Sequence, residues 1–157
     1  MKRNTTMLRS LLVILFVLLL AALTIVGILA VDSAHGYPEY AHLAWPTYIS
    51  ILLGFVPVVL ALWRMWKLAS LVARDAAFTG ATVMEIHRIK QYIVWFMAWF
   101  FVGSIAFRIA FGFVGPVVGA IWLLLEVAAA FLFAVVAILE LLFASAVALR
   151  EDAELTV

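Results

Sequence analysis

The chain alternates between long apolar segments and short polar ones. Four stretches, at approximately residues 10–31, 47–72, 83–111 and 117–149, consist mainly of apolar side chains with few charges between them. About 20 apolar residues in an α-helix cross the hydrocarbon core of a bilayer, because each residue adds about 1.5 Å to the helix. The pattern therefore predicts an all-α integral membrane protein in which residues 1–157 form a single domain of four transmembrane helices.

The connections between these stretches constrain how the helices follow one another. The last connection contains Gly115 and Pro116, and proline fits the first turn of a helix. A connection this short makes its two flanking helices antiparallel neighbours, so the third and fourth helices are predicted to form a hairpin. The fourth stretch is longer than a bilayer is thick, and we expect it to tilt or to project into the cytoplasm at its C-terminal end.

The composition supports a bilayer as the solvent and excludes several classes of chemistry. Hydrophobic residues make up 69% of the chain and charged residues 12%, whereas soluble domains average about 45–50% and about 25%. The chain has no cysteine, which excludes disulfides, thiolate catalysis and cysteine zinc sites. The first apolar stretch follows a basic N-terminal segment like that of a signal peptide, but it is longer than such a segment, so we expect an uncleaved helix.

The positions of Lys and Arg predict the orientation. They cluster before the first stretch, around the connection between the second and third, and after the fourth, and cytoplasmic loops carry such an excess. The sequence therefore predicts a plasma-membrane protein with both termini inside and anionic headgroups around its inner rim. Arg108 is the exception to this pattern, which rests on Lys2, Arg3, Arg9, Arg64, Lys67, Arg74, Arg88, Lys90 and Arg150.

Charged residues inside the apolar stretches are the candidates for structural or functional roles. When the third and fourth helices are folded together, Lys90 comes within a turn of Glu140, and we predict that they pair. Arg108 misses Glu126 by about 9 Å along the axis, and Ser104 comes closer. We interpret Glu126 as a helix-packing residue, and the alternative is that it relays protons or ions.

The polar segment from Arg74 to Lys90 contains a pattern that starts helices. Thr82 and Glu85 form an S/T-x-x-E capping box, which predicts that the third helix begins near Val83. Thr79 is an alternative, earlier cap residue. Phe78 is the one large apolar side chain in this connection, and we expect it to lie at the membrane interface.

No pattern of residues predicts a catalytic or cofactor site. His35, Glu39 and His42 have a spacing that a helix could use for a metal, but Gly36 and Pro38 lie between them and favour an exposed loop. No catalytic motif or phosphate-binding loop occurs in a suitable context. We therefore expect a non-enzymatic protein without cofactor or metal. The absence of a separate basic domain argues against direct binding of nucleic acid.

Two short elements resemble those of a bacterial membrane protein family. Phe78-Thr79 precedes the third helix, and the chain ends in Glu154, Leu155, Thr156 and Val157. With four spans, these elements are similar to the family known as domain of unknown function 2975. Many members have Asn where this chain has Thr82. The resemblance implies a bacterial inner-membrane protein without an established activity, whose genes often neighbour small helix-turn-helix regulators.

Three hypotheses for the function follow. The first is a membrane partner or sensor for a cytoplasmic protein, such as a helix-turn-helix regulator. The second is a small transporter or channel component that uses Glu126 and Arg108, either alone or as a homo-oligomer. The third is an immunity or stress-protection protein. For the first hypothesis, the candidate contact residues are Phe78, Thr79, Thr82, Glu85, Glu154, Leu155, Thr156 and Val157.

Overall fold

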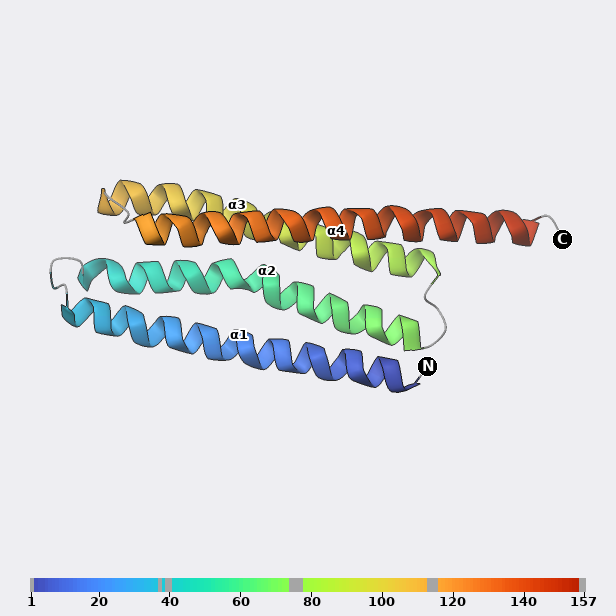
Figure 1. Cartoon of the computed structure of the whole chain (residues 1–157), viewed down its shortest axis with the longest axis horizontal. Coiled ribbons are helices and arrows are strands. Elements are labelled where there is room, and N and C mark those ends of the chain that lie inside the picture. Colours follow the sequence, from blue (N-terminus) through green and yellow to red (C-terminus); the bar gives the residue numbers. More distant parts are fainter. Residues whose placement is uncertain (1, 37, 39–40, 74–77, 113–115, 156–157) are drawn as a thin grey trace.

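A computed structural model of the chain consists of helices and their connections (Figure 1). The four helices are α1 (Lys2–Gly36), α2 (Ala41–Ala73), α3 (Gly80–Phe111) and α4 (Pro116–Leu155). Each contains a segment that is long and apolar enough to cross a membrane, which agrees with the predicted all-α membrane protein. The structure describes residues 2–36, 38, 41–73, 78–112 and 116–155.

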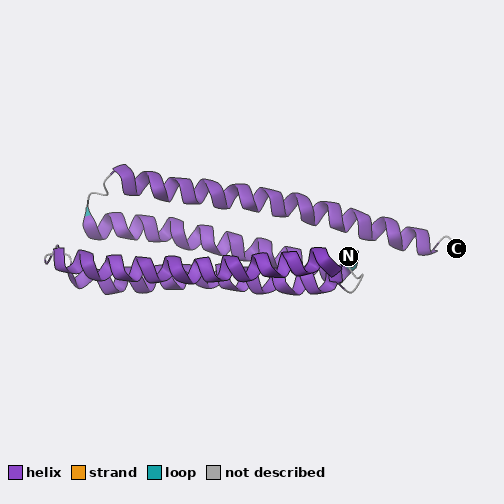
Figure 2. Cartoon of the chain, turned by 60° about the horizontal axis from the view of Figure 1, so that its bottom comes forward, coloured by secondary structure: helices purple, strands orange, loops and turns teal. Residues whose placement is uncertain are grey.

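The helices are arranged in an open row in the order of the sequence. In the described parts of the chain, α1 contacts α2, α2 contacts α3 and α3 contacts α4, while no other pair of helices is in contact. Figure 2 shows α4 at one edge of this row, with α3 between it and the other two helices. The two outer helices therefore do not touch each other.

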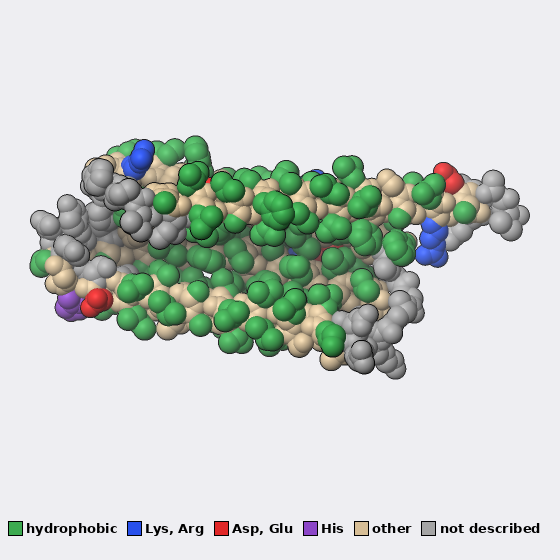
Figure 3. All heavy atoms as spheres, viewed as in Figure 1, with side chains coloured by type: hydrophobic (Ala, Val, Ile, Leu, Met, Phe, Trp, Pro, Cys, Tyr) green, Lys and Arg blue, Asp and Glu red, His purple; other side chains and the backbone are tan. Residues whose placement is uncertain are grey.

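Most apolar side chains point away from the protein. The buried apolar residues in the described ranges are few and aliphatic, and large side chains such as Ile109 and Leu141 are largely exposed. Hydrophobic side chains cover the middle of the face seen in Figure 3, and charged side chains lie mostly near its ends. Such a surface is stable in contact with lipid tails, which are as apolar as leucine.

The helices run lengthwise between two ends of the molecule, and these two ends differ in charge. The start of α1, the end of α2, the start of α3 and the end of α4 lie at one end (Figure 1). We call it the basic end, because the helix segments nearest to it carry Arg9, Lys67, Arg88 and Arg150. The end of α1, the start of α2, the end of α3 and the start of α4 lie at the opposite end. At the basic end α4 extends well beyond the other helices.

Helix α2 bends and α3 has defined ends. Pro57 lies inside α2, and Figure 1 shows a change of direction near the middle of that helix. Proline causes such bends because it lacks the N–H that would bond one turn back. At the end of α3, Gly112 adopts a positive φ of 72°, and its N–H donates to the carbonyl of Arg108 at 2.9 Å. Glycine adopts this backbone conformation without strain.

The predicted capping box at Thr82 and Glu85 is wrong. Helix α3 begins at Gly80, with Thr79 in an extended conformation before it, and the N–H of Thr82 donates to the carbonyl of Thr79 at 3.0 Å. Thr82 is therefore inside the helix, where its side chain is fully buried. The side chain of Glu85 is held by Arg64 of α2, so it does not return to the start of its own helix.

Glycines permit close approaches between neighbouring helices at two positions. A methyl group added at Gly54 of α2 would lie 2.7 Å from Cδ1 of Trp99 in α3. The indole N–H of Trp99 also donates to the carbonyl of Ser50 at 2.9 Å. A methyl group at Gly27 of α1 would lie 3.0 Å from the hydroxyl of Tyr48 in α2. Small residues at such contacts let membrane helices approach closely.

Candidate functional site

The candidate site is a group of polar contacts between helices toward the basic end. Its first member joins α2 to α3. Nη1 of Arg64 lies 3.1 Å from both carboxylate oxygens of Glu85, and the two side chains are only 13% and 16% exposed. In a largely apolar environment each charge would be costly alone, so the pair stabilises the contact between these helices.

The second member joins α3 to α4 through Glu140. Its Oε1 accepts a hydrogen bond from Nδ1 of His87 at 2.7 Å, and its Oε2 is in ion-pair contact with Nζ of Lys90. Nε2 of His87 lies 3.2 Å from the side-chain nitrogen of Gln91 and can accept a hydrogen bond from it. His87 therefore links Glu140 of α4 to Gln91 of its own helix. Lys90 places a positive charge beside the same carboxylate.

The Lys90–Glu140 contact is the one that the register of the two helices predicts. Helices that fold back on each other bring fixed pairs of positions together, because each residue advances the axis by about 1.5 Å. The role of His87 was not predicted. Its spacing to Lys90 places both side chains on one face of α3, so the pattern did contain the signal.

The Arg64–Glu85 pair was also missed, although the same argument finds it. Folding α2 and α3 together near residue 75 pairs positions whose numbers sum to about 150, since each residue adds about 1.5 Å. This register brings Arg64 opposite Glu85 and Gly54 close to Trp99, as observed. Assigning Glu85 to a local cap hid the longer-range contact.

An aromatic contact attaches the connection before α3 to α4. The rings of Phe78 and Phe143 are stacked, with centroids 5.7 Å apart and an interplanar angle of 21°. Phe78 is still half exposed, whereas Thr82 is buried and Glu85 is engaged by Arg64. Thr82 therefore cannot contact a partner directly in this conformation. Phe78 retains accessible surface for such a contact.

The predicted tail residues are only partly covered by the structure. Thr156 and Val157 lie outside the described residues, and the side chains of Glu154 and Leu155 are not described. The backbone of α4 continues to Leu155. Before it, Leu149 is 71% exposed, and Arg150 and Asp152 are exposed as well.

Glu126 and Arg108 are not brought together. Glu126 lies half-buried in α4, and its Oε1 is inaccessible to solvent and has no hydrogen-bond partner among the described residues. Arg108 is exposed, and it forms no ion pair within the described part of the chain. The hydroxyl of Ser104 donates to the carbonyl of Phe101 at 2.7 Å. The three polar residues of this region thus form no common site.

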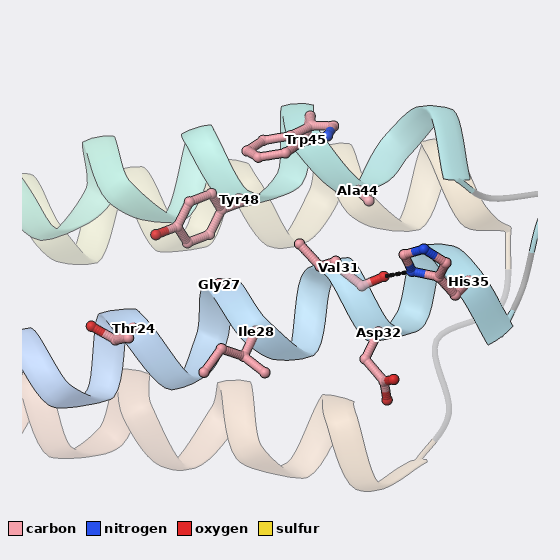
Figure 4. A pocket seen from close by; sticks show the side chains of 9 residues that line it. All are labelled: Thr24, Gly27, Ile28, Val31, Asp32, His35, Ala44, Trp45 and Tyr48. Atoms are coloured by element: carbon pink, nitrogen blue, oxygen red, sulfur yellow. Dashed lines mark hydrogen bonds between the residues drawn. The ribbon is translucent and has the colours of Figure 1, made fainter.

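A pocket of about 870 Å³ lies between α1 and α2 at the opposite end (Figure 4). Tyr48 projects from α2 toward α1, where Thr24, Gly27 and Ile28 form the other wall, and Trp45 lies along α2 at the border of the pocket. Nδ1 of His35 lies 2.8 Å from the carbonyl of Val31, and Figure 4 shows the ring turned back along its own helix.

The opposite end shows no metal cluster in the ranges that the structure describes. Of the three residues with metal-like spacing, Glu39 lies outside those ranges. His35 is in the last turn of α1, and His42 is in the first turn of α2. The two histidines therefore belong to different helices, and most of the residues between these helices lie outside the described ranges.

Comparison with known proteins identifies a family. The model of the family described as "Protein of unknown function (DUF2975)" matches residues 28–157, which include the end of α1 and all of α2, α3 and α4. The match confirms the resemblance noted from Phe78-Thr79 and the C-terminal residues. No curated protein and no solved structure matches the chain.

Proposed function

The chain belongs to the DUF2975 family of proteins of unknown function, and on this premise we propose a role from the surfaces of the molecule itself. The protein is a non-enzymatic component of the bacterial inner membrane that holds a cytoplasmic protein partner, such as a helix-turn-helix regulator, at the membrane. The observation that carries this proposal is the projection of α4 beyond the other helices at the basic end (Figure 1).

The chemistry of the projecting segment suits a protein contact. A transmembrane helix needs only about 20 residues to cross the hydrocarbon, and α4 has 40. Its projecting end combines the exposed apolar side chain of Leu149 with exposed Arg150 and Asp152. We call these three residues, together with half-exposed Phe78, the inner contact surface. Apolar side chains beside charges are typical of surfaces that bind proteins.

In this proposal the basic end faces the cytoplasm, with both termini inside. The support is the distribution of Lys and Arg, because the positive-inside rule counts the residues near the ends of the spans. The chain has no cysteine, so single cysteines at the exposed positions Asp32 and Asp152 can be labelled without background. We expect a membrane-impermeant reagent to label position 32 in intact cells and position 152 only after lysis. Labelling of both positions from outside contradicts the orientation.

The partner is tested by site-specific photo-crosslinking in cells that produce the full chain. A crosslinker at Leu149 should capture one cytoplasmic protein, and the same group at Ile109 of α3, near the opposite end, is the control. The captured protein should be found in the membrane fraction with the unmodified chain. It should return to the cytosol when Leu149→Glu is introduced. Equal capture from both positions refutes the proposal. So does a captured protein that stays in the membrane fraction when Leu149→Glu is introduced.

A second candidate function is transport of protons or ions, with Glu126 as the membrane-embedded group. The observation that favours it is the inaccessible, unpartnered Oε1 of this carboxyl group among the described residues, because membrane-embedded carboxyl groups often mark ion pathways. Flux into liposomes that contain the purified chain tests it. If the chain is a transporter, Glu126→Gln should abolish the flux and Arg108→Gln should lower it. A flux equal to that of empty liposomes excludes transport by the chain.

A further inference from the structure

A groove lies between α1 and α2 toward the basic end, separate from the polar contacts of α3. It encloses about 260 Å³, and its walls are apolar side chains of both helices, among them Phe16, Val59, Trp63 and Trp66. Because the groove belongs to segments that are apolar enough to cross a membrane, its contents in a bilayer are lipid chains.

Arg9 and Lys67 lie beside this groove, each over one of its tryptophans, and Arg64, which is paired with Glu85, also lies over Trp63. The guanidinium carbon of Arg9 lies 5.5 Å from the ring centroid of Trp66, and Nζ of Lys67 lies 4.5 Å from that of Trp63. Cation–π contacts at these distances orient a side chain and leave its hydrogen-bond donors free. The same two rings therefore line an apolar groove and position two positive charges at its border.

Arg9 and Lys67 differ from Arg64 and Lys90 in having no carboxylate partner among the described residues. Arg64 and Lys90 are paired with Glu85 and Glu140, but the ion pairs of the described residues do not include Arg9 or Lys67. Nη2 of Arg9 donates to the hydroxyl of Ser70 at 3.4 Å, which is a long bond to a neutral acceptor. A counter-charge from outside the chain would balance them.

We propose that this groove is a binding site for one anionic glycerophospholipid. Its phosphate lies between Arg9 and Lys67, and one of its acyl chains lies along Val59 and the two tryptophans. Arginine and lysine are the usual ligands of phosphate, and tryptophan is enriched at the level of headgroups. The groove distinguishes a lipid from a free phosphate, which has no apolar part to fill it. This inference does not depend on the proposed function.

Native mass spectrometry of the full chain in detergent tests the site. We expect phosphatidylglycerol to remain bound with clear preference over phosphatidylethanolamine of the same acyl chains. The Arg9→Gln/Lys67→Gln variant should weaken the binding of phosphatidylglycerol by about 25-fold, since each cation near the headgroups contributes on the order of a fivefold change and the two factors multiply. Val59→Trp, which fills the groove without changing the charge, should lower binding of both lipids.

The matched control is Arg88→Gln/Arg150→Gln, which removes the same charge from the basic end away from the groove. It should retain the binding of the unmodified chain, and circular dichroism should show equal helix content in all variants. The proposal is overturned by equal binding of the two lipids to the unmodified chain or by equal losses in the two double variants. Displacement of the lipid by glycerol 3-phosphate also overturns it, because a headgroup site alone would then suffice.

Discussion

The two halves of the interface between α3 and α4 are held together in different ways. Toward the basic end, Glu140 contacts both His87 and Lys90. Toward the opposite end, the ring of Phe107 packs edge-on against Trp122 at 5.1 Å, and one oxygen of Glu126 has no hydrogen-bond partner among the described residues. Both carboxyl groups lie on one helix within an apolar segment. The presence of a cation in contact range is what separates a structural carboxylate from a candidate for function.

The interface between α2 and α3 repeats this division. The Arg64–Glu85 pair lies toward the basic end, and farther along, Gly54 lets Trp99 lie directly against α2. Ion pairs thus join the helices toward the basic end, where each of these side chains is still partly exposed. Close packing joins them nearer the middle of the apolar segments, which contain no ion pair among the described residues.

The largest loss of stability is expected from Gly54→Leu, which disrupts the close packing between α2 and α3. The new side chain collides with the indole of Trp99, because even a methyl group would lie 2.7 Å from Cδ1. Overpacking of this kind costs about 2 kcal/mol. Thermal unfolding in detergent should show a lower midpoint. Gly103→Leu is the control, since nothing lies within 4 Å of a methyl group at Gly103, and equal losses in the two variants would contradict the packing argument.

A smaller loss of stability is expected from Lys90→Met, which breaks the ion pair between α3 and α4 toward the basic end. Glu140 loses its charged partner, while the side chain remains only 17% exposed. Because both groups keep some access to water, we expect a loss of about 1 kcal/mol in the free energy of unfolding. In Lys90→Met/Glu140→Leu no charge is left unpaired, and most of the stability should return. A double variant less stable than the single one would disprove the pairing.

The smallest effect is expected from Glu126→Gln, which sharpens the contrast between the two carboxyl groups. The substitution removes no ion pair in the described part of the chain, and the amide avoids any charge in the apolar segment. The free energy of unfolding should change by less than about 0.5 kcal/mol. Glu140→Gln is the matched comparison and should lower the unfolding midpoint further. Equal losses would mean that Glu126 has a structural partner after all.

The sequence predicts the helices better than it predicts their arrangement. Length and hydropathy are sufficient for four spans, because a bilayer requires an apolar helix of nearly fixed length. The axial register also follows from residue counting, which is why Lys90 and Glu140 were paired correctly. Local signals failed at Thr82 and Glu85, because a longer-range partner, Arg64, took the side chain that the capping box requires.

The open row could not be predicted from the pattern of side chains. Each helix is apolar on all sides, so no stripe marks the face that contacts protein. Lipid and protein offer similar apolar surroundings to a leucine, and the choice of neighbour depends on small residues and a few polar contacts. Gly27 and Gly54 mark two such contacts. Their role becomes visible only when Tyr48 and Trp99 are seen against them.

The open row also bears on how the chain is made. Every contact between helices in the described ranges joins consecutive elements, so no helix must wait for a distant part of the sequence before it can dock. Local contacts of this kind form fast, because little chain entropy is lost in closing short loops. Each helix can therefore pack against the preceding one as soon as it has entered the bilayer. Assembly can follow the order of synthesis, and α4 is then the last helix to dock.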